Sequence, residues 1–162
     1  MKGKIKAGEG TLIGNAGEYY VMAELLKRGI VAALAPRNAP SFDILATRSN
    51  RTIKIRVKTK SQEYSIWQWA VKKDGNIFRN LSEDGDFTVL VDLAMKDKNL
   101  KFYIVPTYQI NTWLKKDFTE WVITPGKNNR PHDSTNKKRS LSQEKYALEL
   151  SKYFNQWEKL WE

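Results

Sequence analysis

Apolar and polar residues alternate most regularly over residues 52–59 of the chain. Because successive side chains of a β-strand point to opposite faces of a sheet, this alternation predicts a strand with one apolar face and one basic face. A second β-rich run at 42–47 precedes it, and Ser49-Asn50 between the two runs favours a tight turn. We therefore expect an antiparallel hairpin. Its basic face carries Lys54, Arg56 and Lys58.

Apolar residues recur at helical spacing over residues 16–28, ahead of this hairpin. Asn15 is a favourable N-cap residue, and Glu18 three positions later completes the pattern of a capping box. Gly29 follows, and glycine is a common residue for ending a helix because it adopts left-handed backbone without steric cost. The pattern predicts a helix over 16–28.

The rest of the chain alternates between short β-rich runs and helical runs. Strands are expected at 30–34, 64–71, 87–94 and 101–105, and helices at 106–116 and 146–160. Residues 124–140 are polar and basic and contain two prolines, which predicts a flexible loop. The order of elements predicts an α/β fold with a mixed central sheet flanked by helices, and the absence of repeats or a linker predicts one domain over 1–162.

The composition excludes several kinds of site. The chain has no cysteine, which removes disulfides, thiolate zinc sites and cysteine nucleophiles. The single histidine, His132, removes multi-histidine metal sites, and its polar, basic surroundings predict an exposed loop residue. No apolar run approaches the ~20 residues of a membrane span, and no secretory signal pattern is present, so we expect a cytoplasmic protein.

The net charge of +10 is unevenly distributed. Residues 1–60 hold twelve Lys or Arg against four Asp or Glu, and residues 127–139 hold five against one. The remaining two segments are each close to neutral. Two basic segments of this kind indicate a polyanionic partner, because phosphate contacts supply most non-specific nucleic-acid affinity. A basic protein kept in solution by its charge is the alternative.

One group of residues could carry chemistry on this hairpin. In an antiparallel pair the start of one strand faces the end of the next, so Asp43 is expected beside Arg56 and Lys58. With Glu18 from the preceding helix, two carboxylates could hold Mg²⁺ and water against a phosphate. The lysine could orient the water and offset the phosphate charge.

These residues lie in motifs that resemble the PD-(D/E)XK nuclease superfamily, in its restriction-endonuclease-like and Holliday-junction-resolvase-like branches. The motifs are Gly17-Glu18, Phe42-Asp-Ile-Leu45 and Ile53-Lys-Ile-Arg-Val-Lys-Thr59. Later segments resemble a bacterial subgroup of largely unknown function. These segments are 87–93, 102–106 and 153–157. The resemblance implies a core in which a helix is followed by a β-meander, then a helix and a further strand.

The resemblance also implies roles for individual residues. It makes Asp43 a metal ligand, with the backbone carbonyl of Val57 and with Glu18, and it makes Lys58 the catalytic lysine. The implied cofactor is Mg²⁺ or Mn²⁺, the implied substrate is DNA, and by analogy a homodimer is expected. Arg56 departs from the family pattern, which has Glu, Asp or Gln there. A guanidinium has no acceptor and cannot ligate a cation.

Each of these residues also has a purely structural interpretation. Glu18 could serve only as a helix cap, Asp43 as a turn residue and Lys58 as an edge-strand residue. Arg56 could form an ion pair with Asp43 or Glu18, or it could grip a DNA phosphate. The functional hypotheses are therefore a metal-dependent endonuclease, a non-catalytic nucleic-acid-binding protein, and an interaction module of a defence or mobile-element system.

Overall fold

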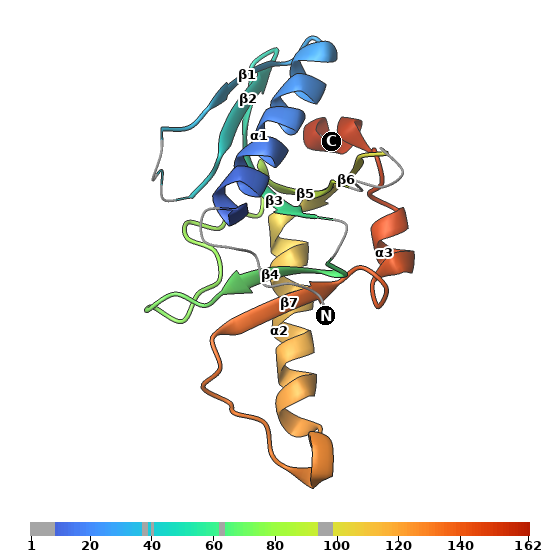
Figure 1. The fold of residues 1–162 in the computed structure, drawn as a ribbon. Helices are drawn as coiled ribbons and strands as arrows, with labels where there is room; N and C mark the ends of the chain where they lie inside the picture. Colours follow the sequence, from blue (N-terminus) through green and yellow to red (C-terminus); the bar gives the residue numbers. More distant parts are fainter. Residues whose placement is uncertain (1–8, 37–38, 40, 62–63, 94–98) are drawn as a thin grey trace.

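The computed structural model describes residues 9–36, 39, 41–61, 64–93 and 99–162 (Figure 1). The strands are β1 (Val31–Leu34), β2 (Ile44–Arg48), β3 (Arg51–Lys60), β4 (Ile66–Ala70), β5 (Asp86–Asp92), β6 (Lys101–Pro106) and β7 (Lys138–Ser142). The helices are α1 (Glu9–Lys27), α2 (Thr107–Ile123) and α3 (Ala147–Ser151), with 3-10 turns η1 (Lys127–Asn129) and η2 (Trp157–Trp161). The predicted α/β architecture with a mixed sheet and flanking helices is confirmed.

Five strands form the central sheet, in the order β1-β2-β3-β5-β6, and β4 pairs with β7 in a second sheet. The first three strands form an antiparallel meander, β3 and β5 are parallel, and β5 and β6 are antiparallel. The predicted hairpin is present, with Ile44 opposite Ile55 and with Ser49 at a positive φ of 54° in the turn. The helix and meander agree with the core that the family resemblance implies.

Helix α1 covers one face of the central sheet (Figure 1). Val21 and Leu25 of the helix belong to one buried cluster with Ile53 and Ile55 of β3. These strand residues are the apolar face of the alternating segment, so the period-two pattern correctly identified the buried side. At its C-terminal end the helix stops as expected, because Gly29 adopts a φ of 73° and donates its N–H to the carbonyl of Leu26.

The start of α1 differs from the prediction. The helix already includes residue 9, so Asn15 lies within it and cannot be its N-cap. The local capping-box pattern was therefore misleading, and Glu18 occupies the middle of a 19-residue helix. A structural role for Glu18 as a helix cap is excluded by this position.

The opposite face of the sheet is covered by α2 and by the β4–β7 pair. Trp67 of β4, Leu90 of β5 and Ile110 of α2 belong to this second buried cluster. Strand β4 and the segment 71–85 connect the parallel strands β3 and β5, in place of the helix that the family resemblance implies. The connection is thus itself part of the second layer.

Two expectations for the C-terminal third are wrong. Residues 138–140, predicted to be in a loop, begin β7 and pair with β4. The continuous helix expected over 146–160 is instead α3, a short turn segment and η2. Residues 153–155 of the turn segment lie along β6: Ile104 donates its N–H to the Tyr153 carbonyl at 3.0 Å, and Asn155 donates to the Phe102 carbonyl at 2.9 Å. These hydrogen bonds satisfy backbone groups on the edge of β6. They favour this conformation over the helix that the spacing of apolar residues predicts.

No helix in the described part of the chain is long and apolar enough to cross a bilayer.

Candidate functional site

Asp43 lies immediately before β2 and extends the pairing of β2 with β3 through its backbone and its side chain. Its backbone N–H donates to the carbonyl of Ile55 at 2.9 Å, and its carboxylate Oδ2 accepts the N–H of Val57 at 2.7 Å. A side chain therefore replaces the next rung of the ladder. Because the N–H and C=O of one strand residue point the same way, the Val57 carbonyl also faces this end of β2. The structure thus brings Asp43 and Val57 together as predicted.

Glu18 is placed by the close packing of α1 on β3. A Cβ atom at the adjacent Gly17 would lie 1.8 Å from Oγ1 of Thr59, so only glycine permits this approach. Glu18 and Asp43 both line a cleft of about 280 Å³ between α1 and the loop that follows β1. The other lining residues are Thr11, Asn15, Tyr19, Leu34, Ala35, Pro36, Ala39 and Phe42.

Lys58 lies on the polar face of β3, two positions after Arg56. Its ammonium lies 5.5 Å from the ring centroid of Trp69, and its parallel neighbour on β5 is the apolar Leu90. Burial lowers the pKa of Lys58; the negative charge of Asp43 acts in the opposite direction, and the nearby Lys72 adds to the lowering. Within the described residues, no carboxylate lies within 4 Å of the Lys58 ammonium.

The carboxyl of Asp43 has the complementary property. Burial raises its pKa above the ordinary value, although the Val57 hydrogen bond and the charges of Arg56 and Lys58 each act to lower it. A half-buried acid and a half-buried amine thus influence one another electrostatically without a direct ion pair. Burial disfavours the charged form of each side chain. Perturbed pKa values of this kind are common at functional sites, where a bound ion or substrate can stabilise the charged forms.

Arg56 has a different partner from either of those expected. Its Nε donates to Oδ1 of Asp86 at 2.9 Å and its Nη2 donates to Oδ2 at 2.8 Å, while Nη2 also donates to the Arg79 carbonyl. Neither Asp43 nor Glu18 accepts these bonds. The side chain of Asp86 is fully buried and that of Arg56 nearly so. The guanidinium therefore leaves the oxygens of Asp43 available for other partners.

Asp86 was missed because its position depends on a non-local pairing. It begins β5, whose seven residues are all buried, and the parallel register places Lys54 beside it. A second buried pair, Lys60 with Asp92 at 2.9 Å, closes the other end of the same two strands. The sequence signal for these pairs is the presence of an acid, Asp86 or Asp92, at each end of an otherwise apolar strand.

The residues present fit a single divalent cation. No group of three or more His, Cys, Asp or Glu that could hold a metal occurs in the described residues. Mg²⁺ is commonly held by one or two carboxylates and keeps several waters, so it does not require such a group. Asp43 and Glu18 supply two carboxylates that line the cleft, and Val57, whose N–H is bound by Asp43, supplies a backbone carbonyl oxygen next to Asp43.

A second and larger cleft, of about 610 Å³, lies between α2 and β7 and contains none of the predicted site residues. Its histidine, His132, is half-buried, in contrast to the exposed residue expected from the sequence. Its imidazole stacks on Trp121 with the ring centroids 4.0 Å apart. This contact gives the histidine a structural role.

The chain was compared with known proteins. The sequence matches no family profile and no curated protein. Among solved structures, Hjc, a Holliday junction resolvase from Archaeoglobus fulgidus, is 14% identical with a TM-score of 0.46, covering 83% of this chain and 88% of that one. The bacterial homing endonuclease I-Ssp6803I is 20% identical with a TM-score of 0.42, covering 88% of this chain and 92% of that one. Both likenesses are distant, and neither assigns a role to any residue of this chain.

Proposed function

We propose that this protein binds DNA and hydrolyses its phosphodiester bonds in a metal-dependent reaction at the cleft between α1 and the loop that follows β1. The observation that carries the proposal is the arrangement around Asp43. One of its oxygens holds the Val57 N–H beyond the end of β2, and its cleft is shared with Glu18. The hydrogen bond from Val57 to Asp43 accounts for one carboxylate at the end of β2, but it does not account for the second carboxylate, Glu18, in the same cleft.

In this proposal Asp43, Glu18 and the Val57 carbonyl hold Mg²⁺ or Mn²⁺. A cation bound there would polarise the phosphate and lower the pKa of a bound water. Lys58 orients the attacking water and offsets the negative charge on the phosphate, which its lowered pKa and its lack of a direct ion pair favour. The water oxygen would bond to phosphorus and give up a proton to solvent, while the bond to the leaving sugar oxygen breaks and that oxygen takes up a proton from solvent.

Arg56 would act through its charge and not as a ligand. Its hydrogen bonds to Asp86 fix its position, and its positive charge still lowers the pKa of Asp43. It therefore helps to keep Asp43 ionised at neutral pH. A carboxylate in its place, as in the family pattern, would add a ligand but would lack this effect.

A second candidate is a protein that binds nucleic acid without cutting it. The presence of arginine at the family's acidic position favours it, because the described residues then offer two carboxylates in the cleft where the family pattern has three. An interaction module in a defence or mobile-element system is a variant of this candidate.

The test is plasmid nicking in Mg²⁺ or Mn²⁺, with Mn²⁺ binding followed by calorimetry. We expect nicking by the wild type and a loss of about 100-fold or more in Asp43→Asn and in Lys58→Ala. Of these two variants, only Asp43→Asn should also lose Mn²⁺ binding. Asp84→Asn, which alters an exposed carboxylate paired with Arg51, is the control and should leave both unchanged.

DNA binding without nicking or Mn²⁺ binding would reject the enzyme and support the second candidate. A homodimer would bring two clefts to the two strands of a duplex, and light scattering at micromolar concentration tests that part of the proposal.

A further inference from the structure

The segment between α2 and β7 projects beyond the end of α2 that lies farther from the central sheet (Figure 1). We call residues 124–137 the arm. Its tip is η1, where Asn128 and Asn129 both have positive φ, at 59° and 57°. Non-glycine residues adopt this conformation at a cost, so it persists only where neighbouring contacts enforce it.

Several contacts fix the arm against α2. The imidazole of His132 stacks on Trp121 at an interplanar angle of 11°, and its Nδ1 lies 2.5 Å from the Trp121 carbonyl oxygen. The N–H of Gly126 donates to the Arg130 carbonyl at 2.8 Å, which closes the tip on itself. These contacts join the outgoing and returning halves of the arm.

The root of the arm is fixed in the same way. The guanidinium of Arg139 lies 3.3 Å from the ring centroid of Phe118 and donates to the Asn136 carbonyl at 2.6 Å. Asp133 accepts the backbone N–H and the hydroxyl of Thr135. The arm is thus ordered by its own hydrogen bonds and stacking, which reduces the entropy lost when it binds a partner.

The arm presents cations that have no acidic partners. Lys127, Arg130 and Lys137 are exposed, and in the described part of the chain none of them forms an ion pair.

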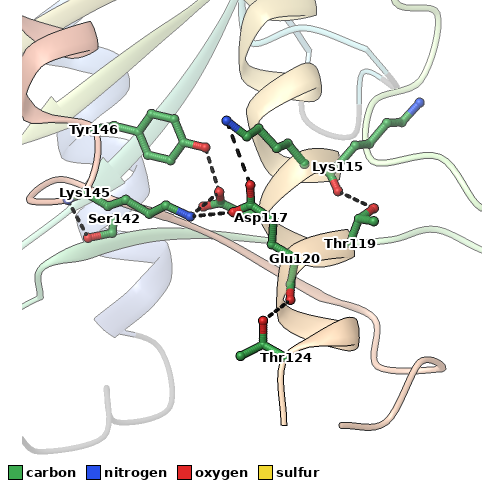
Figure 2. Close-up of polar contacts among 9 residues, drawn as sticks. Lys115, Asp117, Thr119, Glu120, Thr124, Ser142, Lys145 and Tyr146 are labelled. Atoms are coloured by element: carbon green, nitrogen blue, oxygen red, sulfur yellow. Dashed lines mark hydrogen bonds and ion pairs between the residues drawn. The ribbon is translucent and has the colours of Figure 1, made fainter. Parts of the chain in front are cut away.

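The nearest acids on α2 are already paired with cations. Lys145 contacts Asp117 at 2.7 Å and Glu120 at 3.2 Å, as the dashed lines in Figure 2 show, and Lys116 lies 3.9 Å from Glu120. The hydroxyl of Tyr146 donates to the same Asp117 oxygen. The positive charge at the end of α2 is therefore not cancelled locally, which suits a polyanion.

We infer that the arm is a preorganised second contact for duplex DNA, gripping phosphates on the flank of the site that the cleft engages. The choice of DNA rests on the proposed function. Helix α2 has 17 residues and is about 25 Å long, which corresponds to about seven base pairs at 3.4 Å each. Because this helix separates the arm from the central sheet (Figure 1), we expect the arm to engage the duplex several base pairs away from the cleft.

The test is fluorescence anisotropy without divalent metal, which makes it independent of catalysis. The tip variant Lys127→Ala/Arg130→Ala should bind a 24-base-pair duplex about tenfold more weakly, and its salt dependence should be shallower by about 1.8 in log–log slope. The matched control, Lys115→Ala/Lys152→Ala, removes the same charge from exposed positions outside the arm and should change the slope by less than about 0.5. An 8-base-pair duplex, too short to span both sites, should bind the wild type and the tip variant equally.

His132→Ala separates geometry from charge, because it removes the stacking contact with Trp121 without changing a formal charge. It should weaken binding to the long duplex by about threefold and leave the short duplex unaffected. Equal losses in the tip variant and the control, or an unchanged slope in the tip variant, would overturn the inference. So would a loss of binding to phosphatidylserine vesicles with DNA binding retained, since the partner would then be a membrane surface. Because the assay contains no divalent metal and measures binding alone, failure of the proposed catalysis stays distinguishable from failure of the arm.

Discussion

Arg56 holds Asp86 through two parallel hydrogen bonds, from Nε to Oδ1 at 2.9 Å and from Nη2 to Oδ2 at 2.8 Å. The pair joins the parallel strands β3 and β5, and both of its side chains are largely buried. Arg56, which departs from the nuclease motif, is thus the partner of a buried carboxylate on another strand. Replacing Arg56 with an acid is therefore expected to destabilise the fold, in addition to any effect on activity.

Arg56→Glu should lower the free energy of unfolding by about 3–5 kcal/mol, because it leaves Asp86 buried without its partner and adds a like charge. Replacing both members, in Arg56→Met/Asp86→Leu, should recover most of that loss. Urea denaturation measures both. Arg48→Glu is the control, since Arg48 and its partner Glu158 are largely exposed, and it should cost less than about 1 kcal/mol. A folded, fully stable Arg56→Glu protein would contradict the buried pair.

Asp43→Asn should be at least as stable as the wild type at pH 7. Burial raises the pKa of Asp43, so ionising it in the folded state is unfavourable, while the Asn carbonyl can still accept the Val57 N–H. The advantage of Asn should shrink as the pH falls towards about 4, where the carboxyl becomes protonated in the unfolded chain also.

Asp43→Ala provides the contrast for this prediction. It orphans the Val57 N–H and should lose about 1–3 kcal/mol at either pH. Thermal denaturation at pH 7 and pH 4.5 distinguishes the two variants, and equal behaviour would show that the hydrogen bond to Val57 is unimportant.

Lys58→Met should stabilise the protein by about 1 kcal/mol at pH 7, a gain of the size found when a functional residue is replaced by one that suits its surroundings. Burial lowers the pKa of Lys58, so its protonated form is disfavoured in the folded state. The wild type should recover stability as the pH rises through this lowered pKa towards the ordinary value of about 10.4, and the advantage of Met should then disappear. Chemical denaturation between pH 7 and pH 10 measures this, and a difference that grows with pH would refute it.

Gly17→Ala should destabilise the fold by about 1–3 kcal/mol, because its Cβ cannot fit against Thr59 without moving α1 away from β3. Gly14→Ala in the same helix has nothing within 4 Å and should instead stabilise by about 0.5–1 kcal/mol. Adding Thr59→Ala to Gly17→Ala should restore part of the loss. If the two glycine variants behave alike, the close approach of α1 to β3 is wrong.

The elements around the cleft were predictable because their signals are local. The alternation over 52–59 and the turn at Ser49 define the hairpin, and the position of Asp43 follows from antiparallel pairing. The partner of Arg56 was not predictable, because it depends on which strand lies parallel to β3, and the resulting side-chain pair joins residues 30 positions apart.

The C-terminal third shows a second limit. The spacing of its apolar residues fits a helix, but Tyr153 and Asn155 meet unpaired backbone groups on the edge of β6. Local spacing carries no information about such an edge. Likewise, the basic composition of 124–140 identified the charge of the arm but not the stacking of His132 on Trp121 that orders it.

The covering of β6 by residues 153–155 also has a consequence during protein synthesis. Strand β6 is complete at Pro106, whereas the segment that caps its edge is made about 50 residues later, a delay of roughly 3–10 s at 5–20 residues per second. During that interval the nascent chain carries an apolar strand with an open edge, which is a template for pairing between chains. Crowded polysomes and slow codons between these two points should therefore favour co-translational aggregation, and chaperones that bind early would be needed most at this stage.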